Sequence, residues 1–216
     1  MTMTASSQVI TLLGAESTGK TTLVRELSRI LVSRGLDAVM VPEALRLFCD
    51  HIGRTPLPHE QAGIAAEQTR LIEAARAQHQ LILADTSAVM IAVYSDHLFD
   101  DQSLYAQAEQ DHAQASMTLL TSLDLAWTPD GLQRDGPHVR EPVDALIRAS
   151  LQRTGQPYAI VAGQGVSRIQ HALSGIEHLL DTPARQARAA SSPRWRWFCD
   201  NCDDGECEQH WLPRPR

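Results

Sequence analysis

Short apolar segments alternate along this chain with longer segments whose apolar positions recur at helical spacing. The apolar runs are bounded by turn-forming residues, which is typical of buried strands, and they cover residues 8–13, 38–41, 81–84, 123–127 and 158–161. Between them, apolar positions three or four residues apart predict helices over residues 21–34, 43–50, 59–79, 87–97, 103–121, 143–153 and 167–180. Strands that alternate with helices indicate an α/β fold, with a parallel sheet of about five strands covered by helices on both faces.

Two stretches lie outside this alternation. Residues 128–140 are rich in Gly, Pro, Asp and Arg, which predicts a mobile loop. The composition changes near Asp181, and residues 181–216 contain three of the four Trp and three of the four Cys. We therefore predict one domain over residues 1–180, followed by a linker and tail over 181–216.

The composition narrows the classes of function. Of the 216 residues, 43% are hydrophobic and 21% charged, which is usual for a globular protein. The net charge of −7 disfavours a general nucleic-acid binder, because phosphate neutralisation needs a basic face. No apolar run approaches the ~18 residues of a membrane helix, and the N-terminal residues do not resemble a signal peptide. The four cysteines do not form a disulfide framework, so we expect a cytoplasmic protein that does not bind membranes.

The strongest motif lies between the first predicted strand and the first predicted helix. It reads G-A-E-S-T-G-K-T over residues 14–21 and matches the phosphate-binding loop pattern G-x-x-x-x-G-K-[ST]. Its glycines let backbone N–H groups surround phosphates, Lys20 can reach the β- and γ-phosphates, and the Thr21 hydroxyl can bind Mg²⁺. Lys20 is also the only lysine of the chain. The residues expected to contact ATP here are Gly14, Glu16, Ser17, Thr18, Gly19, Lys20, Thr21 and Thr22.

A chance match in a loop is the alternative for this motif, and the flanking strand and helix disfavour it.

Two acids then become candidates, because each follows a predicted strand and should lie near the same sheet edge. Asp85 is expected to orient Mg²⁺ or to act as the base, although it could instead cap the following helix. Glu43 is expected near the substrate, or as an exposed acid in the first turn of its helix.

Two further groups complete the candidate nucleotide site. Arg134 and Arg140 lie in the Gly/Pro-rich segment, where a mobile loop could close over the transferred phosphoryl group; both could equally be solvated. Gly163 and Gln164 follow the fifth predicted strand, where adenine commonly rests in this architecture, although glycines after a strand often only form a turn.

Together these motifs resemble a known group of proteins. The glutamate within the phosphate loop, P-E-A-L-R at 42–46, D-T at 85–86 and W-T-P-D-G-L at 127–132 are similar, in this order, to the ribosylnicotinamide kinase domain of the bifunctional NAD-biosynthesis regulators and to related AAA-type P-loop proteins. The resemblance covers roughly residues 8–180. The chain departs from the family pattern E-Y-x-R-E at Ala44 and Leu47, and it contains no H-x-G-H motif of an adenylyltransferase.

The resemblance implies a specific reaction. It is the ATP-dependent phosphorylation of the 5′-hydroxyl of nicotinamide riboside, with Lys20 and Thr21 at the phosphates and Mg²⁺. Asp85 and Glu43 would lie near the ribose or the nucleophile, Arg46 near the substrate, and Trp127 with Arg134 in a lid. The substrate's cationic aromatic ring would suit acidic side chains and a Trp face.

The tail has its own candidate site. Cys199, Cys202, Cys207 and His210 have the spacing of a Cys₃His zinc ligand set, in which each pair chelates from one tight turn. A reduced, unstructured or redox-sensitive tail is the alternative. The tail's six Arg against six acidic residues give no strong basic patch for nucleic acid.

Three functions therefore remain open from the sequence. The first is a small-molecule kinase acting on nicotinamide riboside, with ATP and Mg²⁺ and possible structural Zn²⁺. The second is an ATP-dependent regulatory switch whose zinc-bearing tail binds a partner. The third is a kinase for another nucleoside or small alcohol. The oligomeric state is not specified by any feature of the sequence.

Overall fold

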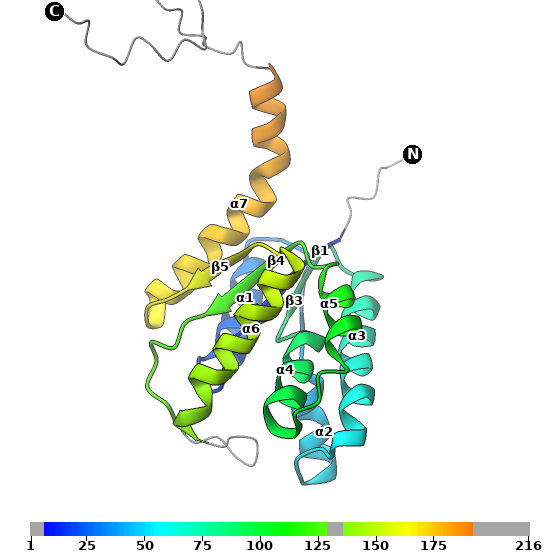
Figure 1. Ribbon diagram of the computed structural model, residues 1–216. Helices are drawn as coiled ribbons and strands as arrows, with labels where there is room; N and C mark the ends of the chain where they lie inside the picture. The colour runs from blue at the N-terminus through cyan, green and yellow to red at the C-terminus, as the bar shows by residue number, and fades with distance from the viewer. Residues whose placement is uncertain (1–6, 129–135, 192–216) are drawn as a thin grey trace, which may run out of the picture. The chain divides into compact units, whose positions relative to one another are not determined.

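The computed structural model describes residues 7–128 and 136–191 of the 216-residue chain, with side chains described up to Asp181. The chain divides into two compact units, Met1–Leu179 and Leu180–Arg216, and the account below concerns the first. Its strands are β1 (Gln8–Leu13), β2 (Ala38–Val41), β3 (Leu81–Ala84), β4 (Met117–Thr121) and β5 (Tyr158–Val161). Its helices are α1 (Lys20–Ser33), α2 (Ala44–Ile52), α3 (Gln61–Arg76), α4 (Ala88–Phe99), α5 (Tyr105–His112), α6 (Arg140–Thr154) and α7 (Gly165–Ser191) (Figure 1).

The five strands form one parallel sheet in the order β2-β3-β1-β4-β5. This arrangement confirms the α/β class and the sheet of about five strands. Strand β1 lies at the centre, and all its residues after Gln8 are buried. Because all strands point the same way, their carboxyl ends meet at one edge of the sheet. The loop after β1 and the segments after β2 and β3 therefore start from the same edge.

Helices cover both faces of the sheet. In the view of Figure 1, α1 lies behind the sheet and α6 in front of it. The largest hydrophobic cluster joins Leu13 and Leu120 of the sheet to buried residues of α3, α4 and α6. Helix α4 is buried from Ala88 to Val93, so it forms the centre of this layer rather than its surface. The carboxyl edge of the sheet, from which the loop after β1 starts, is therefore supported by a close-packed core.

The fourth strand was predicted in the wrong place. Residues 123–127 are irregular, and the strand is Met117–Thr121, inside the segment predicted as a helix over 103–121. Helix α5 ends at His112, and the Ser116 N–H donates to the Val9 carbonyl at the start of the sheet. The Ala- and Gln-rich composition of α5 continues into residues 113–115, so the sequence pattern predicted a helix that runs past the true end of α5. The pairing of Thr118–Thr121 with β5 decides the structure instead.

Smaller differences concern the boundaries of the elements. A 3₁₀ turn at Pro58–Glu60 precedes α3, and another at Pro137–Val139 precedes α6, which therefore begins inside the predicted 128–140 loop. Residues 129–135 lie outside the described part of the chain. Helix α7 continues to Ser191, so residues 181–191 are helical where a linker was predicted.

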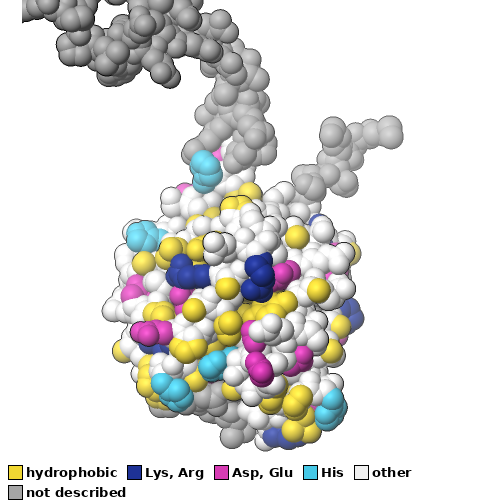
Figure 2. Space-filling view, viewed as in Figure 1, with side chains coloured by type: hydrophobic (Ala, Val, Ile, Leu, Met, Phe, Trp, Pro, Cys, Tyr) yellow, Lys and Arg dark blue, Asp and Glu magenta, His cyan; other side chains and the backbone are white. Residues whose placement is uncertain are grey.

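Figure 2 shows the charged side chains on one face of the molecule. On the face drawn in Figure 2, Lys and Arg side chains are interspersed with Asp and Glu rather than gathered into one patch. No helix in the described ranges is both long and apolar enough to cross a membrane.

Candidate functional site

The phosphate loop connects β1 to α1 and is shaped by two residues of left-handed conformation. Ser17 has φ of 56° and Gly19, the N-cap of α1, has φ of 75°. Successive left-handed and right-handed residues turn backbone N–H groups toward one concave space, which binds anions. Gly14 is required for a different reason: a Cβ there would lie 2.0 Å from the Thr121 hydroxyl oxygen of β4. The loop therefore packs directly against β4.

Polar contacts hold the loop from inside and outside. The Thr18 hydroxyl donates to the Ala15 carbonyl at 2.8 Å, and the Thr121 hydroxyl donates to Thr18 Oγ1 at 2.7 Å. On the inner side, Lys20 Nζ donates to the carbonyls of Gly14 at 2.6 Å and Ala15 at 2.9 Å. The ammonium of the chain's only lysine is thus held within the loop that is expected to receive the phosphates.

A buried arginine of α7 donates a hydrogen bond to the backbone of the phosphate loop. Arg168 is 5% exposed, and its Nη2 donates to the Thr18 carbonyl at 2.8 Å. In a trans peptide the C=O and the next N–H point in opposite directions. By fixing the Thr18 carbonyl on its own side, Arg168 turns the Gly19 N–H to the other side of the loop. Sequence analysis missed this residue, because a single Arg on an amphipathic helix carries no motif.

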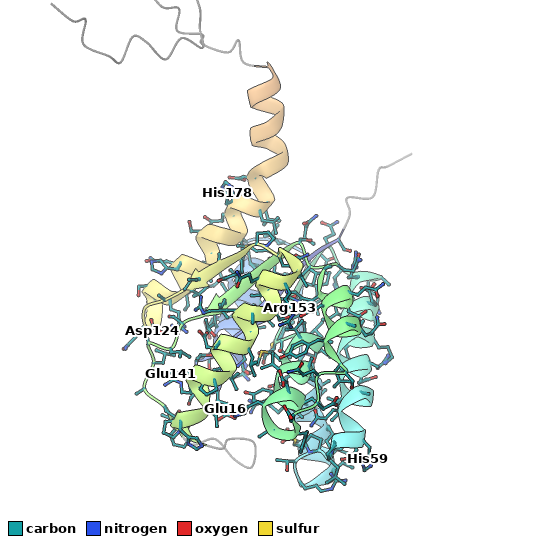
Figure 3. The ribbon with its side chains drawn as sticks, in the orientation of Figure 1. Glu16, His59, Asp124, Glu141, Arg153 and His178 are labelled. Atoms are coloured by element: carbon teal, nitrogen blue, oxygen red, sulfur yellow. The ribbon has the colours of Figure 1, made fainter. Side chains whose placement is uncertain are left out.

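The same guanidinium organises the loops after β4 and β5. Arg168 Nη1 donates to Asp124 Oδ1 at 2.7 Å and to the Gly163 carbonyl at 2.9 Å, while the Gly163 N–H donates to Asp124 Oδ2 at 2.5 Å. Burial raises the pKa of Asp124, but hydrogen bonds from Arg168, the Gly163 N–H and Ser122 outweigh it and lower the pKa to about 2. Figure 3 labels Asp124 in the loop that follows β4. The predicted adenine turn at Gly163 is therefore joined to the phosphate loop through Arg168.

A cavity of about 620 Å³ opens from the phosphate loop. It lies between that loop, helix α2, the segment 55–57 and the end of α4, and this volume is within the range of small-molecule sites. The residues that line it are Glu16, Ser17, Thr18, Gly19, Lys20, Thr21, Thr22, Arg25, Glu43, Leu45, Arg46, Cys49, Thr55, Pro56, Leu57, Gln61, Tyr94, Leu98 and Phe99. The far wall of the cavity, opposite the phosphate loop in the sense that it lies outside residues 16–22, consists of apolar and aromatic side chains together with polar ones.

Glu43 and Arg46 stand on the α2 side of this cavity. Glu43 is the N-cap of α2, but its side chain makes no capping hydrogen bond and is only 12% exposed. Its carboxylate lies 3.6 Å from Arg46 Nε. The backbone of this turn is held by Gln68, whose Oε1 accepts from the Ala44 N–H at 2.7 Å. The position of Glu43 on the cavity favours the substrate interpretation over that of an exposed acid in a first helical turn.

Asp85 is buried at the carboxyl end of β3. It is 1% exposed, its N–H donates to the Val41 carbonyl at 2.8 Å, and Oδ1 has no hydrogen-bond partner among the described residues. The helix-cap alternative is not what the structure shows, because the N-cap of α4 is Ser87, whose Oγ accepts from Val89 N–H. Thr86 between them has φ of 96°, which is strained for a β-branched residue. Such strain next to a buried acid is common at functional sites.

The wall formed by residues 55–57 is fixed by one ion pair. Arg54 donates to both carboxylate oxygens of Glu60, at 2.7 and 2.8 Å, and the Leu57 N–H also donates to Glu60 at 2.7 Å. The Arg54 side chain, together with the Leu57 N–H, lowers the pKa of Glu60 to about 2. A bidentate pair of this kind sets the geometry of the segment that carries Leu57 to the cavity.

Several predicted residues lie away from the cavity. Trp127 precedes Thr128, whose N–H donates to Ser17 Oγ at 2.8 Å, so this segment packs against the phosphate loop rather than lining the cavity. Arg140 is buried and donates to the Leu125 carbonyl at 2.9 Å. Gly163 and Gln164 do not line the cavity either.

Other predicted residues lie in segments that the structure does not describe. Arg134 lies outside the described residues, as do Cys199, Cys202, Cys207 and His210. Among the residues that are described, no group of three or more His, Cys, Asp or Glu side chains is arranged to hold a metal ion.

The far wall was not found from the sequence. Leu45, Leu57, Tyr94, Leu98 and Phe99 come from three separate segments, and each reads locally as an ordinary apolar helix or loop position. Arg25, Cys49, Thr55, Pro56 and Gln61 also line the cavity and were not predicted. One signal was available in the sequence. The P-E-A-L-R motif at 42–46, whose Glu43 was a substrate candidate, leads into α2 and could have suggested that α2 lines the site.

Comparison with known proteins supports this architecture. The profile of the family described as AAA domain matches residues 9–168, which is most of the chain. No curated protein matches it. A crystal structure of NadR protein in complex with NR has a TM-score of 0.69 at 21% identity, covering 81% of this chain and 52% of that chain. Another, in complex with NAD and AMP-PNP, has a TM-score of 0.65 at 20% identity, covering 81% and 49%.

The chain spans about half the length of the NadR chains it matches. At this level of identity, the likeness shows a shared P-loop fold.

Proposed function

Because the chain belongs to the family described as AAA domain, we propose that it is an ATP-dependent phosphotransferase that acts on a nucleoside-like alcohol. The observation that carries this proposal is that the cavity extends beyond the phosphate loop. It begins at Lys20 and Thr21 and continues between α2, α4 and residues 55–57. A protein that only hydrolyses ATP needs no second pocket beside the terminal phosphate, whereas a kinase needs a place for its acceptor.

The acceptor that we propose is nicotinamide riboside, phosphorylated at its 5′-hydroxyl to nicotinamide mononucleotide. The order of motifs in the sequence supports it, and so does the fold shared with the NadR structure in complex with NR. The cavity's chemistry is compatible with that molecule. Tyr94 and Phe99 supply aromatic surface for a cationic pyridinium.

Two residues fit a magnesium ion. Thr21 lies in the first turn of α1 and lines the cavity, and Asp85 has a buried Oδ1 without a hydrogen-bond partner among the described residues. Hydroxyl and carboxylate oxygens are the ligands that Mg²⁺ prefers, and a buried carboxylate oxygen needs such a partner. Magnesium bound there supplies neutralisation of the charge on the transferred phosphoryl group.

The remaining roles follow from position. The backbone N–H groups of the phosphate loop and Lys20 bind the β- and γ-phosphates and stabilise the charge of the transition state. The acceptor hydroxyl attacks the γ-phosphorus, the bond from that phosphorus to the β–γ bridging oxygen breaks, and ADP leaves. The hydroxyl proton passes to Glu43, because its carboxylate lines the cavity and Asp85 is assigned to magnesium. Arg46 orients the Glu43 carboxylate.

The experiment is a panel of acceptors assayed by coupled ADP formation. Nicotinamide riboside, adenosine, uridine and ribose are each supplied with Mg·ATP, alongside a reaction without acceptor and one with Lys20→Ala. We expect acceptor-dependent ADP formation that is fastest with nicotinamide riboside and absent in the variant. Equal ATP hydrolysis with and without every acceptor would refute the kinase and favour the regulatory switch.

A further inference from the structure

Helix α3 carries two buried glutamines on one face that have different environments. Gln61 is 2% and Gln68 is 0% exposed, and their separation of seven positions makes about two helical turns. The Gln68 amide is satisfied at both ends, because Oε1 accepts from the Ala44 N–H at 2.7 Å and Nε2 donates to the Pro42 carbonyl at 3.3 Å. Gln68 is therefore explained by the turn that it holds.

Gln61 has no such explanation. It lines the cavity, and its Oε1 is buried without a hydrogen-bond partner among the described residues. Leaving a buried amide oxygen unbonded is costly, so such groups normally have a partner in the working protein. The cavity lining does include donor groups, on Arg46, Thr55 and Tyr94 for example, but none of them donates to Gln61 Oε1. Because Gln61 lines the cavity, a donor on a molecule that occupies the cavity is the partner that fits.

The chemistry of the amide narrows the class of that molecule. A primary amide presents a donor and an acceptor side by side, and its last bond can rotate to present either end. A carboxamide on the ligand offers the complementary pair, whereas a carboxylate offers acceptors alone and would leave Oε1 unbonded. Gln61 is also the only side-chain amide among the described residues that line the cavity.

We infer that Gln61 determines acceptor specificity by binding the carboxamide of a nicotinamide-type ring and so discriminating against the corresponding ring carboxylate. This inference rests on the proposed kinase function and deepens it, since it assigns a residue to the part of the acceptor that does not react. Sites built to hydrogen-bond a polar group reject analogues that leave their own buried groups unpaired.

The test is the ratio of kcat/KM for nicotinamide riboside to kcat/KM for nicotinate riboside, which carries a carboxylate instead. The ratio is measured for the wild type, Gln61→Leu and Gln61→Glu. The leucine removes the amide at similar volume, and the glutamate keeps an oxygen acceptor for the carboxamide N–H. Gln68→Leu is the matched control, because it makes the same change on the same helix. It should lower the melting temperature and reduce both activities by the same factor.

We expect the wild type to favour the carboxamide by roughly tenfold or more. Gln61→Leu should bring the ratio close to 1, while Gln61→Glu should keep the preference and Gln68→Leu should leave the ratio unchanged. KM for ATP should be the same in all folded variants. If Gln61→Leu does not fold, Gln61→Met takes its place, with the same expected ratio.

The outcomes separate the two claims. Turnover of nicotinamide riboside with a ratio that Gln61→Leu does not change, or no preference in the wild type, would overturn the role of Gln61 alone. A wild type that phosphorylates no member of the acceptor panel would overturn the proposed function, and this inference with it.

Discussion

The two sides of the cavity are built in opposite ways. The phosphate side is one contiguous segment, residues 16–22, and hydrogen bonds from Thr121, Arg168 and Thr128 hold it in place. The acceptor side is assembled from α2, residues 55–57, α3 and α4, and half-buried side chains form much of it. In the proposed kinase, the phosphate side would bind the same group in every reaction and can be rigid, whereas the acceptor side would bind the molecule for which the protein is selective. Changes on the first side should therefore affect all acceptors alike, and changes on the second should discriminate between them.

The largest effect expected is on the phosphate side, at Lys20. Lys20→Ala should reduce phosphoryl transfer by at least ~10³-fold with every acceptor, because the ammonium stabilises charge that develops in the transition state. Lys20→Arg should also be severely impaired, since a forked guanidinium does not fit among the loop carbonyls that Lys20 contacts. Circular dichroism would check that both variants fold. Near-normal turnover by the arginine variant would contradict this view of the loop.

Next is Asp85, at the sheet edge between the two sides. Asp85→Asn should lower kcat by about 10²-fold or more and raise the Mg²⁺ concentration needed for half-maximal rate, because the buried oxygen loses its charge. The measurement is a magnesium titration of initial rates at saturating ATP. A loss of only a few-fold with the same magnesium dependence would remove Asp85 from the metal site.

A smaller effect is expected at Arg168, which touches the phosphate loop from outside. Arg168→Lys should raise KM for ATP by about tenfold, since an ammonium cannot replace a fork that serves Thr18, Asp124 and Gly163 together. KM for the acceptor should not change. Arg148→Lys, at an ion pair within α6, is the matched control and should alter neither constant. An equal rise of both KM values in Arg168→Lys would mean that the arginine serves only general stability.

The smallest effect expected is on stability, in a region that belongs to neither side. Burial lowers the pKa of His112 to about 4, and its Nε2 lies 3.0 Å from Thr118 Oγ1. The unfolded chain binds a proton below about pH 6.5, while the folded state resists until about pH 4. This contribution to stability is therefore complete above pH 6.5 and is lost as the pH falls toward 4, by about 3 kcal/mol in all.

Urea unfolding at pH 7 and pH 5 measures this change. His112→Gln should flatten the pH dependence without changing the ratio of activities toward different acceptors. If the wild type and His112→Gln lose stability equally between these pH values, the assignment to His112 is wrong.

The same contrast explains what the sequence could predict. The place of the phosphate loop between β1 and α1 could be predicted, because its motif is a local spacing of Gly14, Gly19 and Lys20. Arg168 and Gln61 could not be, since their importance comes from contacts with segments far away in the chain. The fourth strand failed for a related reason, because sheet pairing rather than local pattern decides where β4 begins.

Zinc binding by Cys199, Cys202, Cys207 and His210 stays a prediction from spacing alone. Elemental analysis of protein purified without chelators should find one zinc ion per chain, and the metal should be lost when the cysteines are replaced by serine. Metal-free, folded protein would end that idea without affecting the account of the cavity.

The central claim is that the two sides of the cavity act on one phosphoryl group. Its most direct test is the molar ratio of phosphorylated nicotinamide riboside to ADP, quantified by mass spectrometry in a single reaction of the wild-type chain with Mg·ATP. We predict a ratio close to one, with the new phosphate on the 5′-oxygen. ADP that accumulates while the nucleoside remains unmodified would contradict the account.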